Sequence, residues 1–362
     1  MFLAFGEIMA RIAPQQRLRW RQAVPGRVEV TWGGGEANVC ASLAMLGDSV
    51  RYLTALPRQP IARSLVATLR GLGVETDHIL WREQGRLGLY FVEMGADQRG
   101  STVLYDREDS AIFLAAPAEY DFDAALSGVH WLHVTGITPA ISENAFRSNI
   151  ELVQRAKRAG ASVSCDLNFR KKLWNWRPGV SSRQLARECM SQVLGHVDLV
   201  IGNEEDAADV LDIHAEGTNV AQGKINAKAY EQVAREIVRR FPHVARVAIT
   251  LRESISADHN NWGGMLFDAA GGEAFFAPRS KAGDYSPYAI RDIVDRVGAG
   301  DSFAAGLLHA IHSSDFATPD RAIEFAVAAS CLKHSIHGDF NYVTREEIAA
   351  LAAGNATGRV QR

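Results

Sequence analysis

The chain has 362 residues, of which 47% are hydrophobic and 22% charged, with a formal net charge of -3 at pH 7. The length alone suggests about two domains, the composition is that of an ordinary globular protein, and the weak negative charge argues against nucleic acid as a partner. No stretch approaches the roughly 20 apolar residues of a membrane span, which argues against a membrane partner. The four cysteines lie far apart in the sequence, so we expect a cytoplasmic protein with reduced thiols.

The first third of the chain contains short segments that fit strands better than helices. Met1–Pro14 is apolar apart from a few polar residues such as Glu7, and it predicts a strand rather than a signal peptide. Alternating polar and apolar residues, with no helix after them, occur at Arg27–Trp32, Leu87–Met94 and Ser101–Arg107. Such alternation is typical of an antiparallel sheet with one exposed face. We therefore expect a small β-sheet lid from roughly residues 10–32 and 87–110.

The middle of the chain alternates buried strands with helices. Strands are predicted at Val129–Val134, Val163–Leu167, Val197–Ile201 and Val244–Leu251, and helices at Ser142–Ala159, Arg183–Leu194 and Ala229–Phe241. This order predicts an α/β fold, with a mostly parallel sheet between helical layers and ligands at the carboxyl ends of its strands. Long polar loops are predicted at Asp212–Asn226 and Ser254–Gly264, and a flexible tail at 352–362.

The strongest local signal is the turn Gly298-Ala299-Gly300-Asp301. It lies between an apolar run at Ile290–Val294, expected to be a strand, and a helical run at Ala304–Ile311. A strand, a glycine turn and a helix start present backbone N–H groups to an anion. An acid belongs there if Asp301 takes a proton from a hydroxyl that attacks a phosphoryl group held by those N–H groups. The alternative is a structural turn in which Asp301 caps the helix.

Three weaker signals accompany this turn, and each has a structural alternative. Gly34 and Gly35 would let the backbone approach a ligand near Asn38, or else form a flexible turn with a capping Asn38. Asn203 and Asp206 could hold Mg²⁺ through water, or only favour the dipole of the helix that they begin. Arg170, after a strand, could bind a carboxylate or phosphate, or belong to a solvated loop.

Together and in this order, these motifs resemble the PfkB/ribokinase family of sugar kinases, over nearly the whole chain. The resemblance implies a ribokinase-like three-layer α/β/α sandwich, with residues 1–362 as a single kinase domain with a lid, and ATP and Mg²⁺ as cofactors. It implies that Asp301 is the catalytic base and that Gly298, Ala299 and Gly300 form the anion hole. Gly34, Gly35 and Asn38 would bind sugar, and Asn203 and Asp206 would match the phosphate and metal motif. Arg252 and His334 are candidates to line the nucleotide, and Asp295 is a candidate for a monovalent cation such as K⁺.

Within the family the chain is most similar to the 2-keto-3-deoxygluconate kinases. In that subgroup lid aromatics and two arginines hold an open-chain keto acid, and Tyr90, Tyr105, Arg107 and Arg170 stand at the matching places. An arginine pair would favour an acid over a neutral sugar. Four departures from the family pattern are Asp206 for Glu, Arg296 for Thr, Pro57–Ala62 in place of a segment that normally carries glycine and acids, and an extra acid at Glu36.

The resemblance therefore predicts phosphorylation of the terminal primary hydroxyl of a sugar acid, with 2-keto-3-deoxy-D-gluconate as the favoured substrate. One alternative is a kinase for a neutral ketose, pentose or nucleoside, and another is a sugar-binding regulator without catalysis. A dinucleotide-binding oxidoreductase is disfavoured, because Phe303 stands where that fingerprint needs its third glycine. The exposed edges of a lid sheet favour a homodimer or higher homo-oligomer.

Overall fold

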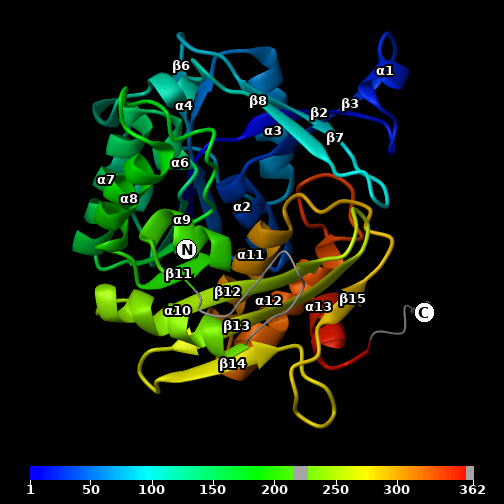
Figure 1. Cartoon of the computed structure of the whole chain (residues 1–362). Helices are drawn as coiled ribbons and strands as arrows, with labels where there is room; N and C mark the ends of the chain where they lie inside the picture. Colours follow the sequence, from blue (N-terminus) through cyan, green and yellow to red (C-terminus); the bar gives the residue numbers. More distant parts are fainter. Residues whose placement is uncertain (215–226, 356–362) are drawn as a thin grey trace.

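A nine-stranded sheet forms the centre of the molecule in the computed structural model, which describes residues 1–214 and 227–355 (Figure 1). Its strands are, in spatial order, β14 (Glu273–Ala277), β13 (Asn260–Asp268), β12 (Arg246–Ser254), β11 (Leu199–Gly202), β10 (Ser162–Asp166), β9 (Trp131–Thr135), β1 (Phe2–Phe5) and β4 (Val50–Leu53). Strand β15 (Tyr288–Ile290) also pairs with β13. The strands from β4 to β12 are parallel, and the β13 pairings are antiparallel. The mostly parallel sheet that the sequence predicts is therefore confirmed.

Helices cover both faces of this sheet, because each central strand points alternate apolar side chains to opposite sides. In β1, Leu3 and Phe5 belong to one hydrophobic core, whereas Phe2 and Ala4 belong to the other. The first core is closed by α4 (Ala111–Leu114), α5 (Phe122–Leu126), α6 (Thr138–Ile141), α7 (Glu143–Arg158), α8 (Ser182–Leu194), α9 (Glu204–Leu211) and α10 (Ala227–Arg240). The second is closed by α2 (Gly35–Met45), α3 (Pro60–Gly71), α11 (Ala299–His312), α12 (Pro319–Lys333) and α13 (Arg345–Ala352).

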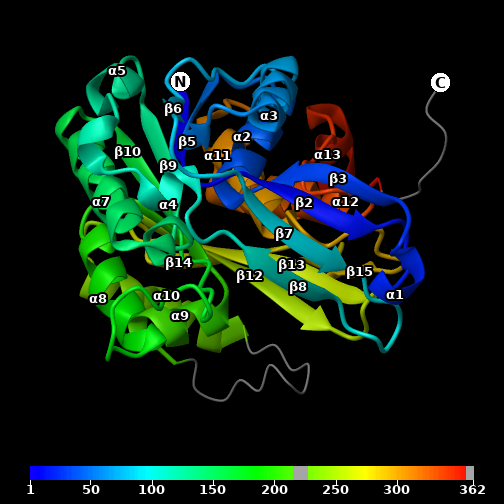
Figure 2. The same ribbon diagram turned by 90° about the horizontal axis from the view of Figure 1, so that it is seen from above.

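A separate four-stranded sheet lies beside the central one (Figure 2). Its order is β3 (Val28–Gly33), β2 (Met9–Pro14), β7 (Gly88–Glu93) and β8 (Thr102–Asp106), so the expected strands of the small sheet are present. The short helix α1 (Trp20–Ala23) joins β2 to β3. The remaining elements are a two-stranded sheet of β5 (Ala55–Pro57) and β6 (Leu80–Arg82), and a single 3-10 turn at Pro117–Glu119.

The long helices of the middle region begin and end close to where the sequence predicts. Ser142 caps α7, since its side chain accepts a hydrogen bond from the N–H of Ala145. Gly160 follows the end of that helix with a φ of 83°, in the left-handed region that favours glycine. Within the described residues, no helix is long and apolar enough to cross a membrane.

Three expected elements differ from the structure. Met1–Pro14 is two strands in two sheets, because the chain leaves the central sheet at Gly6. Ser254–Gly264 is largely strand and hairpin rather than a long loop, since β13 begins at Asn260. Of Ile290–Val294, only Ile290 is in a strand. Of the expected loop at Asp212–Asn226 and the expected tail at 352–362, residues 215–226 and 356–362 lie outside the described residues.

Candidate active site

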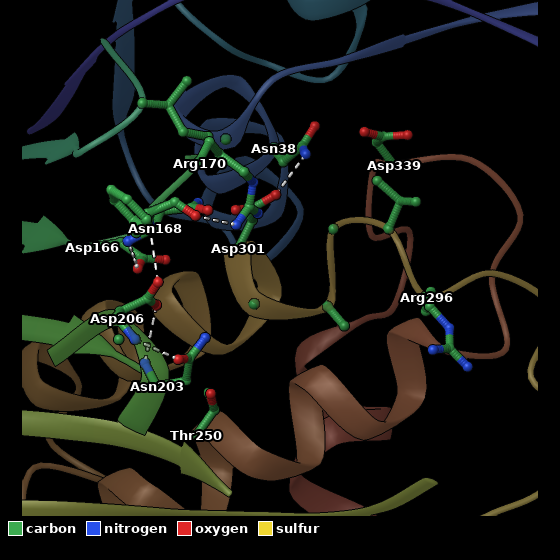
Figure 3. A pocket seen from close by; sticks show the side chains of 18 of the residues that line it. Asn38, Asp166, Asn168, Arg170, Asn203, Asp206, Thr250, Arg296, Asp301 and Asp339 are labelled. Atoms are coloured by element: carbon green, nitrogen blue, oxygen red, sulfur yellow. Dashed lines mark hydrogen bonds between the residues drawn. The ribbon is translucent and has the colours of Figure 1, made fainter. Parts of the chain in front are cut away.

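A cavity of about 550 Å³ opens where the carboxyl ends of the central strands face the small sheet (Figure 3). It brings together fifteen of the sixteen side chains and turn residues that the sequence singles out. They are Gly34, Gly35, Asn38, Tyr90, Tyr105, Arg107, Arg170, Asn203, Asp206, Arg252, Gly298, Ala299, Gly300, Asp301 and His334. Asp295 is the exception, because it is buried behind the cavity with none of its side chain exposed.

The start of α11 forms one wall of this cavity. Gly298 is the N-cap residue, with a φ of 84°, and a Cβ added there would lie 2.2 Å from the carbonyl oxygen of Asp339. The N–H groups of Gly300 and Asp301 donate to no acceptor among the described residues, so they remain available to an anion. The positive end of the helix dipole adds to this preference for negative charge.

Asp301 lies in the first turn of α11 and is held by Asn38 from α2. The Nδ2 of Asn38 donates to Oδ2 of Asp301 at 2.7 Å, and its Oδ1 accepts from the N–H of Gly34 at 3.3 Å. Burial raises the pKa of Asp301 to about 6, although the hydrogen bond from Asn38 opposes this shift. Asn38 is thus inside its helix rather than its cap, and its contacts join the glycine turn to the acid.

Two glycines allow α2 to begin this close to the site. A Cβ at Gly34 would lie 2.1 Å from the carbonyl oxygen of Glu7, so no other side chain fits there without moving backbone. A Cβ at Gly35 would meet Oδ1 of Asp301 at 3.6 Å and would stand in front of that oxygen. Glycine is therefore needed at this turn because the backbone lies close to Glu7 and Asp301, and not because the turn is flexible.

Asn203, Asp206 and Asp166 line a second, acidic part of the cavity at the ends of β10 and β11. Asn203 caps α9, and Asp206 accepts hydrogen bonds from the N–H groups of Phe169 at 2.9 Å and Asn203 at 3.2 Å. Burial raises the pKa of Asp206, and burial with the nearby charges of Asp206 and Asp301 raises that of Asp166. A cation bound here would favour the ionised form of both acids.

Four arginines, Arg107, Arg170, Arg252 and Arg296, line the cavity and differ in their partners. Arg170 donates to the carbonyl oxygen of Phe169 but forms no ion pair with a described residue, and neither does Arg252. Arg107 is instead paired with Glu7, whose Oε2 accepts from Nε of Arg107 at 2.6 Å. The other carboxylate oxygen of Glu7, Oε1, is buried and has no hydrogen-bond partner in the described chain. Arginines that face one cavity without a direct ion pair favour anionic ligands, although the charge of Arg170 also acts on Asp166, Asp206 and Asp301.

The small sheet supplies the aromatic wall. Tyr90 and Tyr105 face each other on β7 and β8, with ring centroids 6.0 Å apart and a stacked orientation. The hydroxyl of Tyr90 donates to Oδ2 of Asp339 at 2.6 Å.

His334, on the far side, is held neutral because burial lowers its pKa to about 4. His334 therefore contributes hydrogen-bonding capacity and an aromatic ring rather than charge.

Both carboxylate oxygens of Asp295, the candidate ligand for a monovalent cation, have partners within the protein. Its Oδ1 accepts from the N–H of Val297, and its Oδ2 accepts from the N–H of Gly338 and forms an ion pair with Nη2 of Arg11 at 2.7 Å. The guanidinium of Arg11 therefore already contacts the carboxylate that the sequence suggested as a ligand for a monovalent cation.

Glu36, the extra acid among the departures from the family pattern, is not among the residues that line the cavity. Its Oε1 accepts hydrogen bonds from the hydroxyls of Thr135 at 2.7 Å and Thr138 at 2.8 Å, and the side chain is 1% exposed. Burial raises its pKa to about 7.

Sequence reasoning missed Glu7, Asp339 and Arg11 as residues of the site or its support. Glu7 carried a signal, since it is an acid inside an apolar run. Asp339 and Arg11 carried none, because their partners lie hundreds of residues away in the chain. Arg296, noted as a departure, lines the cavity and donates to the carbonyl oxygen of Ser256.

The profile of the pfkB family of carbohydrate kinases matches residues 1–237 and 270–342. A crystal structure of 2-dehydro-3-deoxygluconokinase from Thermotoga maritima is 40% identical, with a TM-score of 0.87 over 98% of this chain and 99% of that one. A 2-dehydro-3-deoxygalactonokinase from Haloferax volcanii is 28% identical over 98% of each chain. A structure from E. coli, named as a ribokinase II in complex with ATP and Mg²⁺, shares the fold at 17% identity, with a TM-score of 0.75 over 98% of this chain and 99% of that chain.

Proposed function

Because this chain belongs to the pfkB family of carbohydrate kinases, we propose that it transfers the γ-phosphoryl group of ATP to the terminal primary hydroxyl of a 2-keto-3-deoxy sugar acid. The favoured substrate is 2-keto-3-deoxy-D-gluconate, which would give the 6-phosphate. The observation that carries the proposal is the placement of Asp301, two free backbone N–H groups and the unpaired Arg170 in one cavity. The substrates named for the relatives from T. maritima and H. volcanii are also 2-keto-3-deoxy acids.

In this proposal Asp301 accepts the proton of the attacking hydroxyl. Asn38 fixes one carboxylate oxygen of Asp301, which leaves Oδ1 to face the substrate. The N–H groups of Gly300 and Asp301, shaped by the turn at Gly298 and Ala299, stabilise the negative charge on the phosphoryl group during transfer. The same negative charge is attracted to the start of α11.

The nucleotide would extend from this turn toward Asn203, Arg252 and His334, which line the same cavity. The unpaired guanidinium of Arg252 suits a phosphate, and the neutral His334 suits an uncharged part of the nucleotide. Bound Mg²⁺ would neutralise phosphate charge. Mg²⁺ keeps several waters and needs only one or two carboxylates, which fits the acidic end of the cavity at Asp206 and Asp166.

The acid group of the substrate is assigned to the side of the cavity with Arg170 and Arg107. A carboxylate there gains a charge-assisted contact with Arg170, and the Tyr90–Tyr105 wall packs against the carbon chain. The free Oε1 of Glu7 is an acceptor for a substrate hydroxyl. We propose that Gly34 and Gly35 bring backbone groups against the sugar in the same region.

A neutral ketose is the second candidate, and the pairing of Arg107 with Glu7 favours it. That pairing occupies Arg107 and leaves Arg170, which forms no ion pair with a described residue, to bind an acid. A fructokinase from Oryza sativa is also among the relatives, at 24% identity over 92% of this chain and 91% of the other protein.

We also propose a homodimer through the small sheet, and a cytoplasmic location. Both edge strands of that sheet expose apolar side chains, Val30 on β3 and Leu104 on β8, which a second copy could cover. Use of ATP and the absence of disulfides among the described cysteines support the cytoplasm.

The proposal is tested by measuring ADP release with 2-keto-3-deoxygluconate, its C4 epimer 2-keto-3-deoxygalactonate, fructose and ribose, with phosphorus NMR to place the phosphate. The highest kcat/KM is expected for one of the two acids, with phosphate on the terminal carbon. A higher kcat/KM for fructose would establish the second candidate, and ADP release without a phosphorylated sugar would refute both.

A further inference from the structure

Arg11 is a buried cation with two buried carboxylate partners. It belongs to β2 of the small sheet, and its side chain is 1% exposed. Its Nη2 lies 2.7 Å from Oδ2 of Asp295 and its Nη1 lies 2.8 Å from Oδ1 of Asp339. Burial opposes its charge, but the two carboxylates outweigh burial, and the net effect raises the pKa of Arg11.

Its two partners hold the turn that forms the anion hole. Asp295 accepts from the N–H of Val297 at 3.0 Å and from the N–H of Gly338 at 3.1 Å, and so ties together the two loops behind Gly298. The backbone of Asp339 packs against Gly298 closely enough to leave no room for a Cβ. The position of the turn therefore depends on two carboxylates that are buried away from water, and negative charge buried in this way requires a countercharge.

Monovalent cations bind to oxygen atoms, and three oxygens of this cluster already have protein partners. Both oxygens of Asp295 are engaged, and the carbonyl oxygen of Ile336, in the neighbouring loop, accepts from Nζ of Lys333 at 3.0 Å. Lys333 is also buried; burial lowers the pKa of its ammonium, and the charges of Asp295 and Asp339 oppose that shift. Asp295 and Asp339 thus have the guanidinium of Arg11 as their countercharge, and Lys333 lies within range of their charges.

From this geometry we infer that Arg11 is a built-in countercharge: its guanidinium takes the place of a bound monovalent cation behind the anion hole, so that transfer needs no K⁺ or Na⁺. Arg11 is a positioning residue, since it touches neither the cavity nor the reacting atoms. The inference rests on the proposed kinase function. It goes further in assigning the support of the anion hole to a residue of the small sheet, whose Tyr90 also binds Asp339.

The first test uses the unmodified protein. The kcat is measured in KCl, NaCl and tetramethylammonium chloride at equal ionic strength, and melting temperatures are measured in the same salts. Since the countercharge is a side chain of the protein and is present in every salt, kcat is expected to differ by less than about twofold among the three salts. The melting temperature is not expected to rise in KCl. Activation by K⁺ of about tenfold or more would overturn the inference.

The second test removes the guanidinium. Arg11→Ala is expected to lower kcat by roughly 100-fold, as loss of anion-hole support does, with a smaller effect on the KM for ATP. Added guanidinium chloride or KCl, at concentrations far below those that denature, is expected to restore part of kcat and to raise the melting temperature of this variant alone. Full activity of Arg11→Ala without added cation would refute the inference, as would a deficit that no cation relieves.

Arg19→Ala is the matched control, because Arg19 follows the same strand and pairs with Glu93 at the surface, with 60% of its side chain exposed. It is expected to show neither the loss of kcat nor the response to cations. If Arg11→Ala does not fold, refolding yield with and without guanidinium replaces the kinetic readout. If the unmodified protein phosphorylates no sugar, the proposed function fails, and the melting temperatures of both proteins still decide the role of Arg11.

Discussion

The side-chain amide of Asn38 donates a 2.7 Å hydrogen bond to Asp301 across 263 positions of the chain. It joins the first turn of α11 to a helix that begins at the glycine turn Gly34-Gly35. The contact fixes the orientation of one carboxylate oxygen and leaves the other directed at the space in front of Gly35. An acid held in this way is suited to receive a proton from a hydroxyl placed against the glycine turn.

Asp301→Asn is expected to lower kcat by about 10²- to 10⁴-fold, because the amide keeps the shape of the site but accepts no proton. Binding of ATP, measured by calorimetry, is expected to persist because the N–H groups of the turn are unchanged. Asn38→Ala should give a smaller loss of kcat with the same ATP affinity. A kcat near that of the unmodified enzyme for Asp301→Asn would contradict the assignment of the base.

Gly298→Ala is expected to reduce kcat by roughly 100-fold or more, because the turn must move to relieve both its φ of 84° and the contact with the carbonyl oxygen of Asp339. Gly160→Ala is a matched control. Gly160 has a φ of 83°, and an added Cβ would meet nothing within 4 Å. That control should lower the melting temperature slightly and leave kcat intact. Equal kinetic effects of the two substitutions would show that backbone strain, and not the close approach, causes the loss.

Nine of the fifteen cavity residues that the sequence singles out belong to short local motifs. Gly298–Asp301, Gly34–Asn38 and Asn203–Asp206 each carry a chemical pattern within five positions, and the α/β order places all three at one edge of the sheet. Arg11 has no such pattern, since its partner Asp339 is 328 positions away and the pairing exists only after folding.

The polar segment Ser254–Gly264, expected to be a loop, ends in two glycines that lie in a strand. Gly263 and Gly264 lie in β13, where a Cβ at Gly263 would meet the hydroxyl of Tyr285 and a Cβ at Gly264 would meet the ring of Phe303. These glycines admit neighbouring side chains against a strand, and local sequence does not distinguish that use from a turn.

Selectivity for an acid should depend more on Arg170 than on any other arginine of the cavity. Arg170→Ala is expected to raise the KM for a 2-keto-3-deoxy acid by roughly 10- to 100-fold, because it removes a hydrogen bond to a charged group. The KM for fructose is expected to rise much less. Steady-state kinetics with both substrates measures the difference. An equal rise in both KM values would remove the assignment of the carboxylate to Arg170.

Arg107→Ala should behave differently, because it leaves Glu7 without its ion-pair partner inside the cavity. An unpaired carboxylate there repels an acidic substrate and destabilises the fold. The double variant with Glu7→Gln is therefore expected to recover part of the melting temperature and part of the affinity for the acid. If the two substitutions are simply additive in both measurements, the pair is not coupled.

The pH dependence of kcat/KM should report on Asp301. Burial raises the pKa of this acid to about 6, and the base acts only when ionised. Activity is therefore expected to fall as the pH drops through about 6, well above the range where an exposed aspartate is protonated. A plateau that extends below pH 5 would show that another group limits the reaction.

Glu36 should make the free energy of unfolding depend on pH in the opposite direction from a salt-bridged acid. Its pKa is about 7 in the folded chain against an ordinary 4.5, so between these values the folded state binds more protons than the unfolded state. The free energy of unfolding contributed by this group therefore falls as pH rises through that window, by on the order of 3 kcal/mol at most. Glu36→Gln is expected to flatten the curve, as measured by urea unfolding at several pH values. An unchanged slope would contradict the raised pKa.

The small sheet is joined to the rest of the chain at the same points that build the site. Strand β1 passes into β2 through Gly6, Glu7 and Ile8, and β3 passes into α2 at Gly34, whose backbone lies against the carbonyl oxygen of Glu7. A tilt of the small sheet therefore moves Gly34, and through it the helix that holds Asn38. Binding of the substrate by the small sheet and orientation of Asp301 are therefore coupled. Substitutions that stiffen either connection should change KM and kcat together.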